Sequence, residues 1–293
     1  MNTRDLEYFV AVAKRQNFSA VATQFHVSQP TITVAIKRLE TTFGDELVQR
    51  DRTHALAKLT RAGEILAARA DIILQNLSLA EKEIVQARTE TIRFGLPPVI
   101  GTVYFPKLAG RLLQDHLLDR LQTREAGSGQ LLKELEAGEI DVALLGSLRP
   151  LQNNTLTSIE LTQQAFRIIV SKRHPLATAK QISFATLATE KFVTLTDDFI
   201  HPTALKAYAD AAGFTPKVIY RSPDINLIKE LVANELAVGL LVEDAITDHD
   251  DVVPLVISDA LDLHVNVSLA YRKGFVASKI QQQMINDLKR LGQ

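Results

Sequence analysis

The chain of 293 residues lacks cysteine, strong net charge and any hydrophobic run near membrane-spanning length. Without cysteine it cannot form a disulfide, a cysteinyl zinc site or a thiol nucleophile. A membrane span needs about 20 predominantly apolar residues, and the opening MNTRDLEYF lacks the hydrophobic region of a signal peptide. We therefore expect a cytoplasmic protein that does not enter a membrane.

The net charge of −1 is distributed unevenly. Residues 1–62 hold 9 Lys and Arg against 6 Asp and Glu, whereas the remainder holds 24 against 28. This modest asymmetry permits a basic end on an otherwise acidic molecule, as nucleic-acid binding requires. The length favours two or three domains with a sizeable core.

The N-terminal segment has the pattern of three short-linked helices. Leu6, Phe9, Val10 and Ala13 recur at helical spacing, and a second, short helix follows Asn17. Ser28 is placed to cap a third helix that Gly44 can end. The stripe expected to be buried on that helix consists of Ile32, Ala35, Ile36, Leu39 and Phe43. A short helix, a tight turn and a longer helix are typical of a helix-turn-helix.

Two further elements are expected after this motif. Residues 45–58 lose the helical period and predict a two-stranded wing, with an ordinary solvated loop as the alternative. After the wing, apolar or small residues recur at alternating spacings of four and three positions, and we call this row the seam. The spacing predicts a coiled-coil dimerisation helix, with a helix packed on its own domain as the alternative. The seam residues are Leu59, Gly63, Leu66, Ala70, Ile73, Leu77, Ala80, Ile84 and Ala87.

From residue 92 onward, short apolar runs alternate with helical patterns. The runs lie at 92–96, 140–145, 167–170, 192–195 and 237–241, and the helical patterns at 103–116, 130–137, 203–212 and 224–234. Such alternation indicates an α/β domain with mainly parallel sheets, and about 200 residues suffice for two lobes.

The first quarter of the chain resembles the LysR-type transcriptional regulators. The resemblance is carried by FVAVA at 9–13, NFSAVA at 17–22, VSQP at 27–30, IKRLE at 36–40 and LTRAG at 59–63. It continues more loosely through LEAGEIDVA at 135–143 and HPLA at 174–177. It implies a winged helix-turn-helix, a long linker helix and a two-lobed, periplasmic-binding-protein-like effector domain. Residues 48 and 34 depart from the family's usual Phe and basic residue.

The third helix has a second face suited to DNA. Amide and hydroxyl groups can match base edges in the major groove, whereas cations and the helix N-terminus can hold phosphates. The expected DNA-binding residues are Ser28, Gln29, Pro30, Thr31, Thr33, Lys37, Arg38, Arg50 and Arg52. A solvated helix face is the alternative interpretation of the pattern taken alone.

Enzyme chemistry is disfavoured. Gly127-Ser128-Gly129 fits neither a dinucleotide fingerprint nor a nucleophile elbow, and the seven histidines are scattered without a zinc motif. The stretch at 248–251, Asp-His-Asp-Asp, is more typical of an acidic loop than of a metal site. We expect no catalytic residue, no metal and no cofactor.

Loops after the predicted strands suggest a ligand site, because ligands of two-lobed α/β domains bind at strand carboxyl ends near helix N-termini. By position in the family, the expected lining residues are Val99, Ile100, Thr102, Ser128, Thr196, Phe199, His201 and Thr203. For each of these residues, the alternative to ligand contact is a role as a helix cap or as a loop residue without a special role. For His201, an exposed position near a helix cap is expected more often than ligand contact. The hydroxyls favour a small carboxylate or another anion, whereas Asp197 and Asp198 argue against it and Arg221 is the nearest cation.

The predicted organisation is a winged helix-turn-helix at 1–58, a linker helix at 59–88 and an effector domain at 89–293. Lobe I comprises 92–161 and 267–293, and lobe II comprises 162–266. The resemblance implies a transcriptional regulator whose partners are an operator in double-stranded DNA, a small-molecule coinducer and further copies of itself as a dimer or tetramer. A ligand-independent repressor with a vestigial cleft is the alternative.

Overall fold

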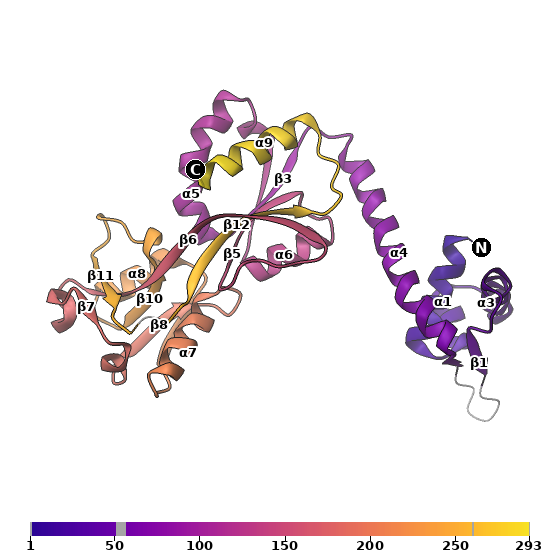
Figure 1. The fold of residues 1–293 in the computed structure, drawn as a ribbon, viewed down its shortest axis with the longest axis horizontal. Coiled ribbons are helices and arrows are strands. Elements are labelled where there is room, and N and C mark those ends of the chain that lie inside the picture. The colour runs from indigo at the N-terminus through magenta and orange to yellow at the C-terminus, as the bar shows by residue number, and fades with distance from the viewer. Residues whose placement is uncertain (1, 51–56, 260, 293) are drawn as a thin grey trace. The chain divides into compact units, whose positions relative to one another are not determined.

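The computed structural model describes residues 2–50, 57–259 and 261–292. It divides into two compact units, Met1–Gln86 and Ala87–Gln293 (Figure 1). Each unit has its own hydrophobic core. None of the helices in these described ranges is long and apolar enough to cross a membrane.

The first unit opens with α1 (Thr3–Arg15), α2 (Phe18–Gln24) and α3 (Gln29–Phe43). Asn2, Asn17 and Ser28 each cap one of these helices through a side-chain oxygen that accepts a backbone N–H. Gly44 ends α3 with φ 72, a left-handed conformation that glycine adopts without a Cβ clash. The predicted positions of the cap and the C-terminus are confirmed.

The buried stripe of α3 is one residue shorter than expected. Ile32, Ala35, Ile36 and Leu39 are at most 3% exposed, but Phe43 is 50% exposed. The prediction for Phe43 was wrong because α3 ends there, beyond the last turn that packs on α1 and α2.

The wing strands β1 (Val48–Arg50) and β2 (Ala57–Leu59) pair antiparallel, with Val48 opposite Leu59. The predicted DNA contact Arg52 lies at 51–56, outside the described residues. Leu59 belongs to β2, so the long helix α4 (Arg61–Gln86) begins after the predicted start at 59. A Cβ at Gly63 would lie 2.0 Å from the Leu47 carbonyl oxygen, so only glycine lets α4 pack this closely on the wing.

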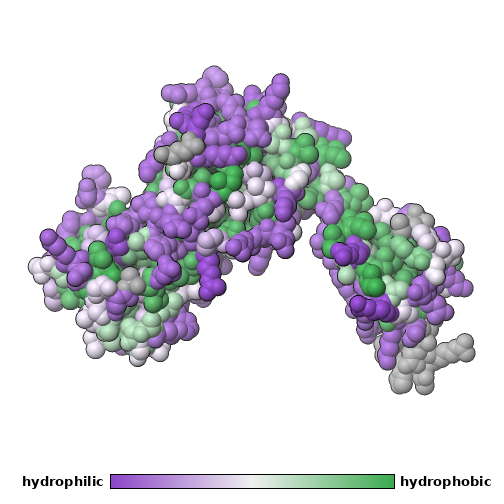
Figure 2. Space-filling model, in the orientation of Figure 1, coloured by the Kyte–Doolittle hydropathy of each residue, from purple (hydrophilic) through white to green (hydrophobic). Residues whose placement is uncertain are grey.

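The seam of α4 has two parts with different environments. Gly63, Leu66 and Ala70 are buried in the first unit. Farther along, Ile73 is 49% exposed and Ile84 62% exposed, and Figure 2 shows hydrophobic residues at the surface along α4. Packing within the domain, the alternative interpretation, therefore applies to the first turns of α4, whereas apolar side chains of its later turns are exposed in the part of the first unit that the structure describes.

The second unit is an α/β structure built on one continuous set of strands. The strands are β3 (Ile92–Leu96), β4 (Leu121–Glu125), β5 (Val142–Ser147), β6 (Leu156–Ser171), β7 (Gln181–Ile182), β8 (Lys191–Leu195), β9 (Lys217–Ser222), β10 (Val238–Val242), β11 (Val252–Ile257) and β12 (His264–Arg272). The helices are α5 (Pro98–Gln114), α6 (Ser128–Glu136), α7 (His201–Ala211), α8 (Ile225–Ala233) and α9 (Lys279–Lys289). Short 3-10 turns lie between them, among them η4 (Glu243–Ala245).

The sheet order is β4-β3-β5-β12-β6-β10-β8-β9, with β11 also paired to β6. Five of the nine pairings among the described strands of this unit are parallel, as the prediction of mainly parallel sheets requires, but β6 and β12 run antiparallel to their neighbours. Both strands carry polar residues along much of their length, and sequence reasoning missed β12 entirely. The arrangement is a mixed sheet.

Two lobes share the long strand β6. Its first part pairs with β12 in a lobe that also holds β3, β4 and β5; its last residues pair with β10 and β11 in a second lobe with β8 and β9. Helices α5 and α9 pack together on the first lobe, while α7 and α8 pack on strands of the second (Figure 1). The predicted divisions at 161/162 and 266/267 fall inside β6, which runs through both lobes, and inside β12, which pairs with its first part.

Candidate functional site

The outward face of α3 carries the candidate DNA contacts. Its inward side chains fill the core of the first unit, and this packing fixes which face is turned to solvent. The predicted residues Ser28, Gln29, Pro30, Thr31, Lys37 and Arg38 are all exposed, and Thr33 is partly exposed. The structure therefore places seven of the nine predicted contacts on one helix and its cap.

Two of the predicted base-reading side chains are already hydrogen-bonded. The Gln29 side-chain oxygen accepts from the Ser19 hydroxyl at 3.2 Å, which leaves its NH₂ group to donate. The hydroxyls of Thr31 and Ser28 lie 2.9 Å apart and bond to each other. On contact with a base edge, these solvent-exposed hydrogen bonds would be replaced by hydrogen bonds to the base.

The two cations of α3 have different surroundings. Arg38 pairs with Asp5, whose carboxylate is 1% exposed, and its Nε donates to Asp5 Oδ2 at 3.2 Å. Arg38 holds the pKa of Asp5 below its usual range by this hydrogen bond, so the pair joins α3 to α1. Lys37 is exposed, and its ammonium group has no hydrogen-bond or ion-pair partner among the described residues. The backbone of Arg50 lies in β1, opposite Ala57.

A pocket in the second unit lies where three helices begin. Val99 and Ile100 belong to the first turn of α5, Ser128 begins α6, and His201 begins α7; all four line the pocket. Phe199 also lines it, so the structure brings together five of the eight predicted ligand residues. The first N–H groups of a helix lack partners within the helix and carry partial positive charge.

The two lobes approach closely beside this pocket. A Cβ on Gly127, just before α6, would lie 2.2 Å from the Asp198 carbonyl oxygen, which belongs to the loop before α7. Glycine at 127 therefore allows the start of α6 to lie against the second lobe. This contact positions Ser128 and Phe199 around the same pocket.

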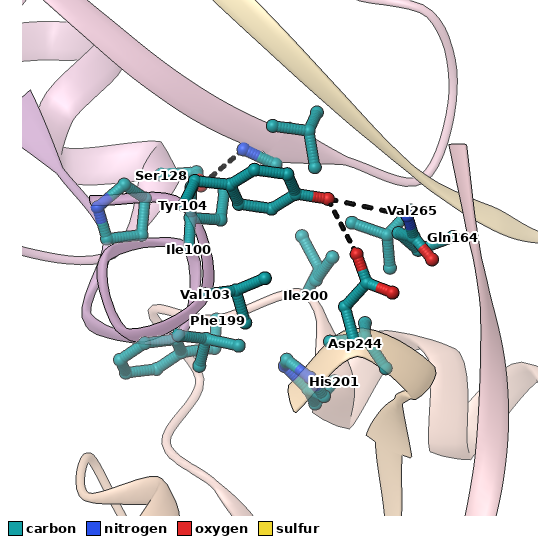
Figure 3. A pocket seen from close by; sticks show the side chains of 15 residues that line it. Ile100, Val103, Tyr104, Ser128, Gln164, Phe199, Ile200, His201, Asp244 and Val265 are labelled. Carbon is teal, nitrogen blue, oxygen red and sulfur yellow. Dashed lines mark hydrogen bonds between the residues drawn. The ribbon is translucent and has the colours of Figure 1, made fainter. Parts of the chain in front are cut away.

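The pocket is mostly apolar and holds a free volume of about 30 Å³, so a ligand larger than water must move its walls apart. The apolar walls are Pro97, Val99, Ile100, Val103, Phe199, Ile200, Val242, Val265 and Val267. Its polar side chains are Ser128, Tyr104, Gln164, His201 and Asp244 (Figure 3). Among the described residues that line it, Asp244 is the one charged group.

His201 is the most unusual of these groups. It is 3% exposed, which corrects the expectation of a surface histidine, and neither ring nitrogen has a hydrogen-bond partner among the described residues. Burial lowers its pKa from 6.5 to about 4, so the ring is neutral at pH 7. A neutral imidazole offers one donor and one acceptor, and buried polar atoms rarely remain unpaired.

A hydrogen-bonded group from three elements forms another wall. Tyr104 on α5 donates its hydroxyl proton to Asp244 Oδ2 at 2.9 Å and accepts from the Gln164 side chain at 3.4 Å (Figure 3). Burial, together with the bond to Asp244, raises the pKa of Tyr104. Sequence reasoning missed all three residues. The one local signal was Gln164, a polar residue just before the buried Phe166. Tyr104 and Asp244 are 140 positions apart, so no sequence pattern indicates that they form a hydrogen bond.

Three predicted threonines do not line the pocket. Thr102 is exposed and donates to the Pro98 carbonyl one turn back, Thr203 is exposed on α7, and Thr196 follows β8 outside the lining. Arg221 pairs with Asp197 at 3.2 Å, and both lie outside the lining as well. The predicted anion-binding hydroxyls thus reduce to Ser128, whose Oγ accepts from the Gly146 N–H at 2.9 Å and retains its own proton to donate.

Both units match known protein families. Residues 3–64 match "Bacterial regulatory helix-turn-helix protein, lysR family", and residues 86–292 match "LysR substrate binding domain". The chain belongs to the LysR family of transcriptional regulators. It is thus a DNA-binding regulator with an effector-binding domain, and the expected family and fold class are confirmed.

Relatives of known name support this assignment. The chain is 36% identical, over 99% of both sequences, to the malolactic fermentation system transcriptional activator of Lactococcus lactis. It is 28% identical to the transcriptional dual regulator OxyR of Escherichia coli, over 82% of this chain and 79% of that one. A full-length OxyR variant of Pseudomonas aeruginosa has the same fold, with a TM-score of 0.57 and 23% identity over 100% of both chains. CbnR in complex with its target DNA has a TM-score of 0.55 and 20% identity, also over 100% of both chains.

Proposed function

We propose that this LysR-family regulator binds its operator through α3 and the wing, as a dimer joined by α4, under the control of a small carboxylate in the pocket. In this proposal Gln29, Thr31 and Thr33 meet base edges. Lys37, Arg50 and Arg52 meet phosphates, and Arg38 chiefly positions α3 through Asp5. The exposed apolar face of α4 from Ile73 onward supports pairing with a second chain.

The observation that carries the ligand proposal is His201, a buried histidine with two unpaired nitrogens, among the described residues, in a pocket surrounded by helix N-termini. Pro98 and Pro202 have no N–H, and the remaining N–H groups in the first turns of α5, α6 and α7, together with Ser128, favour a carboxylate. Asp244, in contrast, repels a second anion and accepts a hydrogen bond. These groups together favour a small acid that carries a carboxylate at one end and a hydroxyl directed toward Asp244 and His201.

The relative from Lactococcus lactis supports this ligand class. It activates a malolactic fermentation system, whose name joins malic and lactic acid, two carboxylic acids that each bear a hydroxyl. The pocket's position between lobes that share β6 supports control of DNA binding, since ligand contacts with both lobes can change their relative placement.

Calorimetric titration of the full chain tests the ligand proposal. Lactate should bind more tightly than propionate, which lacks the hydroxyl, and both more tightly than lactamide, which lacks the charge. Ser128→Ala should weaken lactate binding. Thr102→Val, which removes a hydroxyl outside the pocket, is the matched control and should leave it unchanged. Tighter binding of the amide, or equal binding by Ser128→Ala, would contradict the proposal.

The DNA-binding assignment has its own test. Gln29→Ala should reduce the discrimination between operator and random duplex by about 1–3 kcal/mol if the amide contacts a base. Lys37→Ala should instead weaken both and reduce the salt dependence of binding. If Gln29→Ala left the ratio of operator affinity to random-duplex affinity unchanged, Gln29 would not be a base-contacting residue.

A ligand-independent repressor is the second candidate, and the small free volume of the pocket favours it. The two are separated by operator binding with and without the acids. A ligand-controlled regulator changes its affinity or its footprint on the operator, whereas a ligand-independent one shows neither change.

A further inference from the structure

The centre of the outward face of α3 is occupied by an apolar side chain, Val34. It is 50% exposed, although the opposite face of the same helix is almost fully buried. Its neighbours one turn away, Pro30 and Lys37, are exposed too, and Thr41 continues the same row. Val34 therefore lies in the middle of the surface that α3 presents to solvent.

Val34 and its polar neighbours would be stabilised by contact with DNA in different ways. Thr31 and Gln29 already hold hydrogen bonds, to Ser28 and Ser19, which contact with a base would exchange. Val34 has no polar side-chain atom to exchange, so it gains only by removing its methyl groups from water. Its β-branched side chain has few χ1 rotamers in a helix, and little side-chain entropy is lost when a contact orders it.

The major groove offers one apolar group to such a side chain. Each base pair presents donors and acceptors there, but only thymine carries a methyl group, at C5. From these observations we propose that Val34 is a specificity-determining residue that reads the C5 methyl of one thymine in each operator half-site. This inference rests on the proposal that α3 enters the major groove.

The prediction can be tested by removing single methyl groups from the DNA. Duplexes selected from random DNA by the full-length protein define the preferred half-site, and each thymine is then replaced singly by deoxyuridine. This change removes the C5 methyl and leaves base pairing intact. At one thymine per half-site the affinity of the unmodified protein should fall about fourfold, the loss expected for one methyl group left in water.

The same duplexes with Val34→Ala complete the cycle. Val34→Ala should bring the thymine-to-uracil ratio close to one, because it removes the two γ-methyl groups that reach farthest from the helix and leaves only Cβ. Val34→Thr, which keeps one methyl, should retain part of the ratio, and Lys37→Ala should weaken both duplexes while leaving the ratio unchanged. Val34 is exposed, so circular dichroism should show the variants folded as before.

The outcomes separate this inference from the function on which it rests. If Gln29→Ala changes sequence discrimination but the unmodified protein and Val34→Ala show the same thymine-to-uracil ratio, α3 reads the DNA and the methyl assignment is wrong. If neither substitution alters discrimination, α3 does not read the groove. Selected half-sites without thymine would also overturn the assignment.

Discussion

The Tyr104 hydroxyl donates a 2.9 Å hydrogen bond to Asp244, and this bond connects α5 in the first lobe with η4 in the second. Both residues line the pocket. In the function proposed above, a ligand that widens the pocket would change the surroundings of this bond and thereby the placement of the lobes.

Tyr104→Phe removes the hydroxyl and keeps the ring. We expect the second unit to lose about 1.5–3 kcal/mol of stability, the usual range for a hydrogen bond to a charged group. Differential scanning calorimetry of the full chain measures the loss. Asp244→Asn, which keeps an acceptor, should lose less; equal stability of Tyr104→Phe and the unmodified chain would show that the bond does not hold the lobes together.

His201 makes stability depend on pH. Its pKa is about 4 in the folded chain and 6.5 ordinarily. As the pH falls from 6.5 to 4, the unfolded chain takes up a proton that the folded chain does not, so folding loses stability across that window. The loss amounts to about 3 kcal/mol when complete, and the contribution is fully present above the ordinary pKa.

His201→Phe should remove this pH dependence, because phenylalanine does not titrate and can pack beside Phe166, whose ring lies 5.9 Å from the imidazole. The melting temperature should then fall less between about pH 7 and pH 4.5, while binding of the acid is lost. His249→Gln, at an exposed histidine, is the control and should leave the difference unchanged.

Arg38→Ala should destabilise the first unit, since it leaves the Asp5 carboxylate buried without its cation. Urea unfolding followed by circular dichroism measures this cost. The salt dependence of operator binding should change less than in Lys37→Ala, because the Lys37 ammonium has no ion-pair partner in the part of the chain that the structure describes. A larger loss of salt dependence with Arg38→Ala would make Arg38 a phosphate contact.

Ile73→Asp tests the role of α4. An unpaired charge in an apolar interface is costly, so sedimentation should show a weaker dimer. Operator binding should weaken too, because two linked DNA-binding units bind two half-sites cooperatively. Ser78→Asp adds the same charge at an exposed position outside the seam and should leave the dimer intact. If Ile73→Asp remained fully dimeric, α4 would not be the dimer interface and would pack only within its own unit.

The sequence by itself determined the elements whose signals are local. A cap at Ser28, a left-handed glycine at 44 and an apolar stripe at helical spacing each involve residues within one or two turns. Helix α3 and its outward face were therefore predictable, together with the family, whose motifs lie in the same continuous stretch. The local pattern failed at Phe43, where an apolar residue at the right spacing lies past the packed turns.

Only the tertiary structure decided which polar groups meet in the pocket. Tyr104, Gln164 and Asp244 come from three distant segments, and no spacing along the chain records that they touch. The same holds for Arg38 and Asp5, 33 positions apart, whose pairing turns an apparent phosphate contact into a link between helices. Periodicity depends on a residue's neighbours in sequence, whereas hydrogen bonding and burial depend on its neighbours in space. In the second unit, the passage of β6 through both lobes helps bring the pocket residues together.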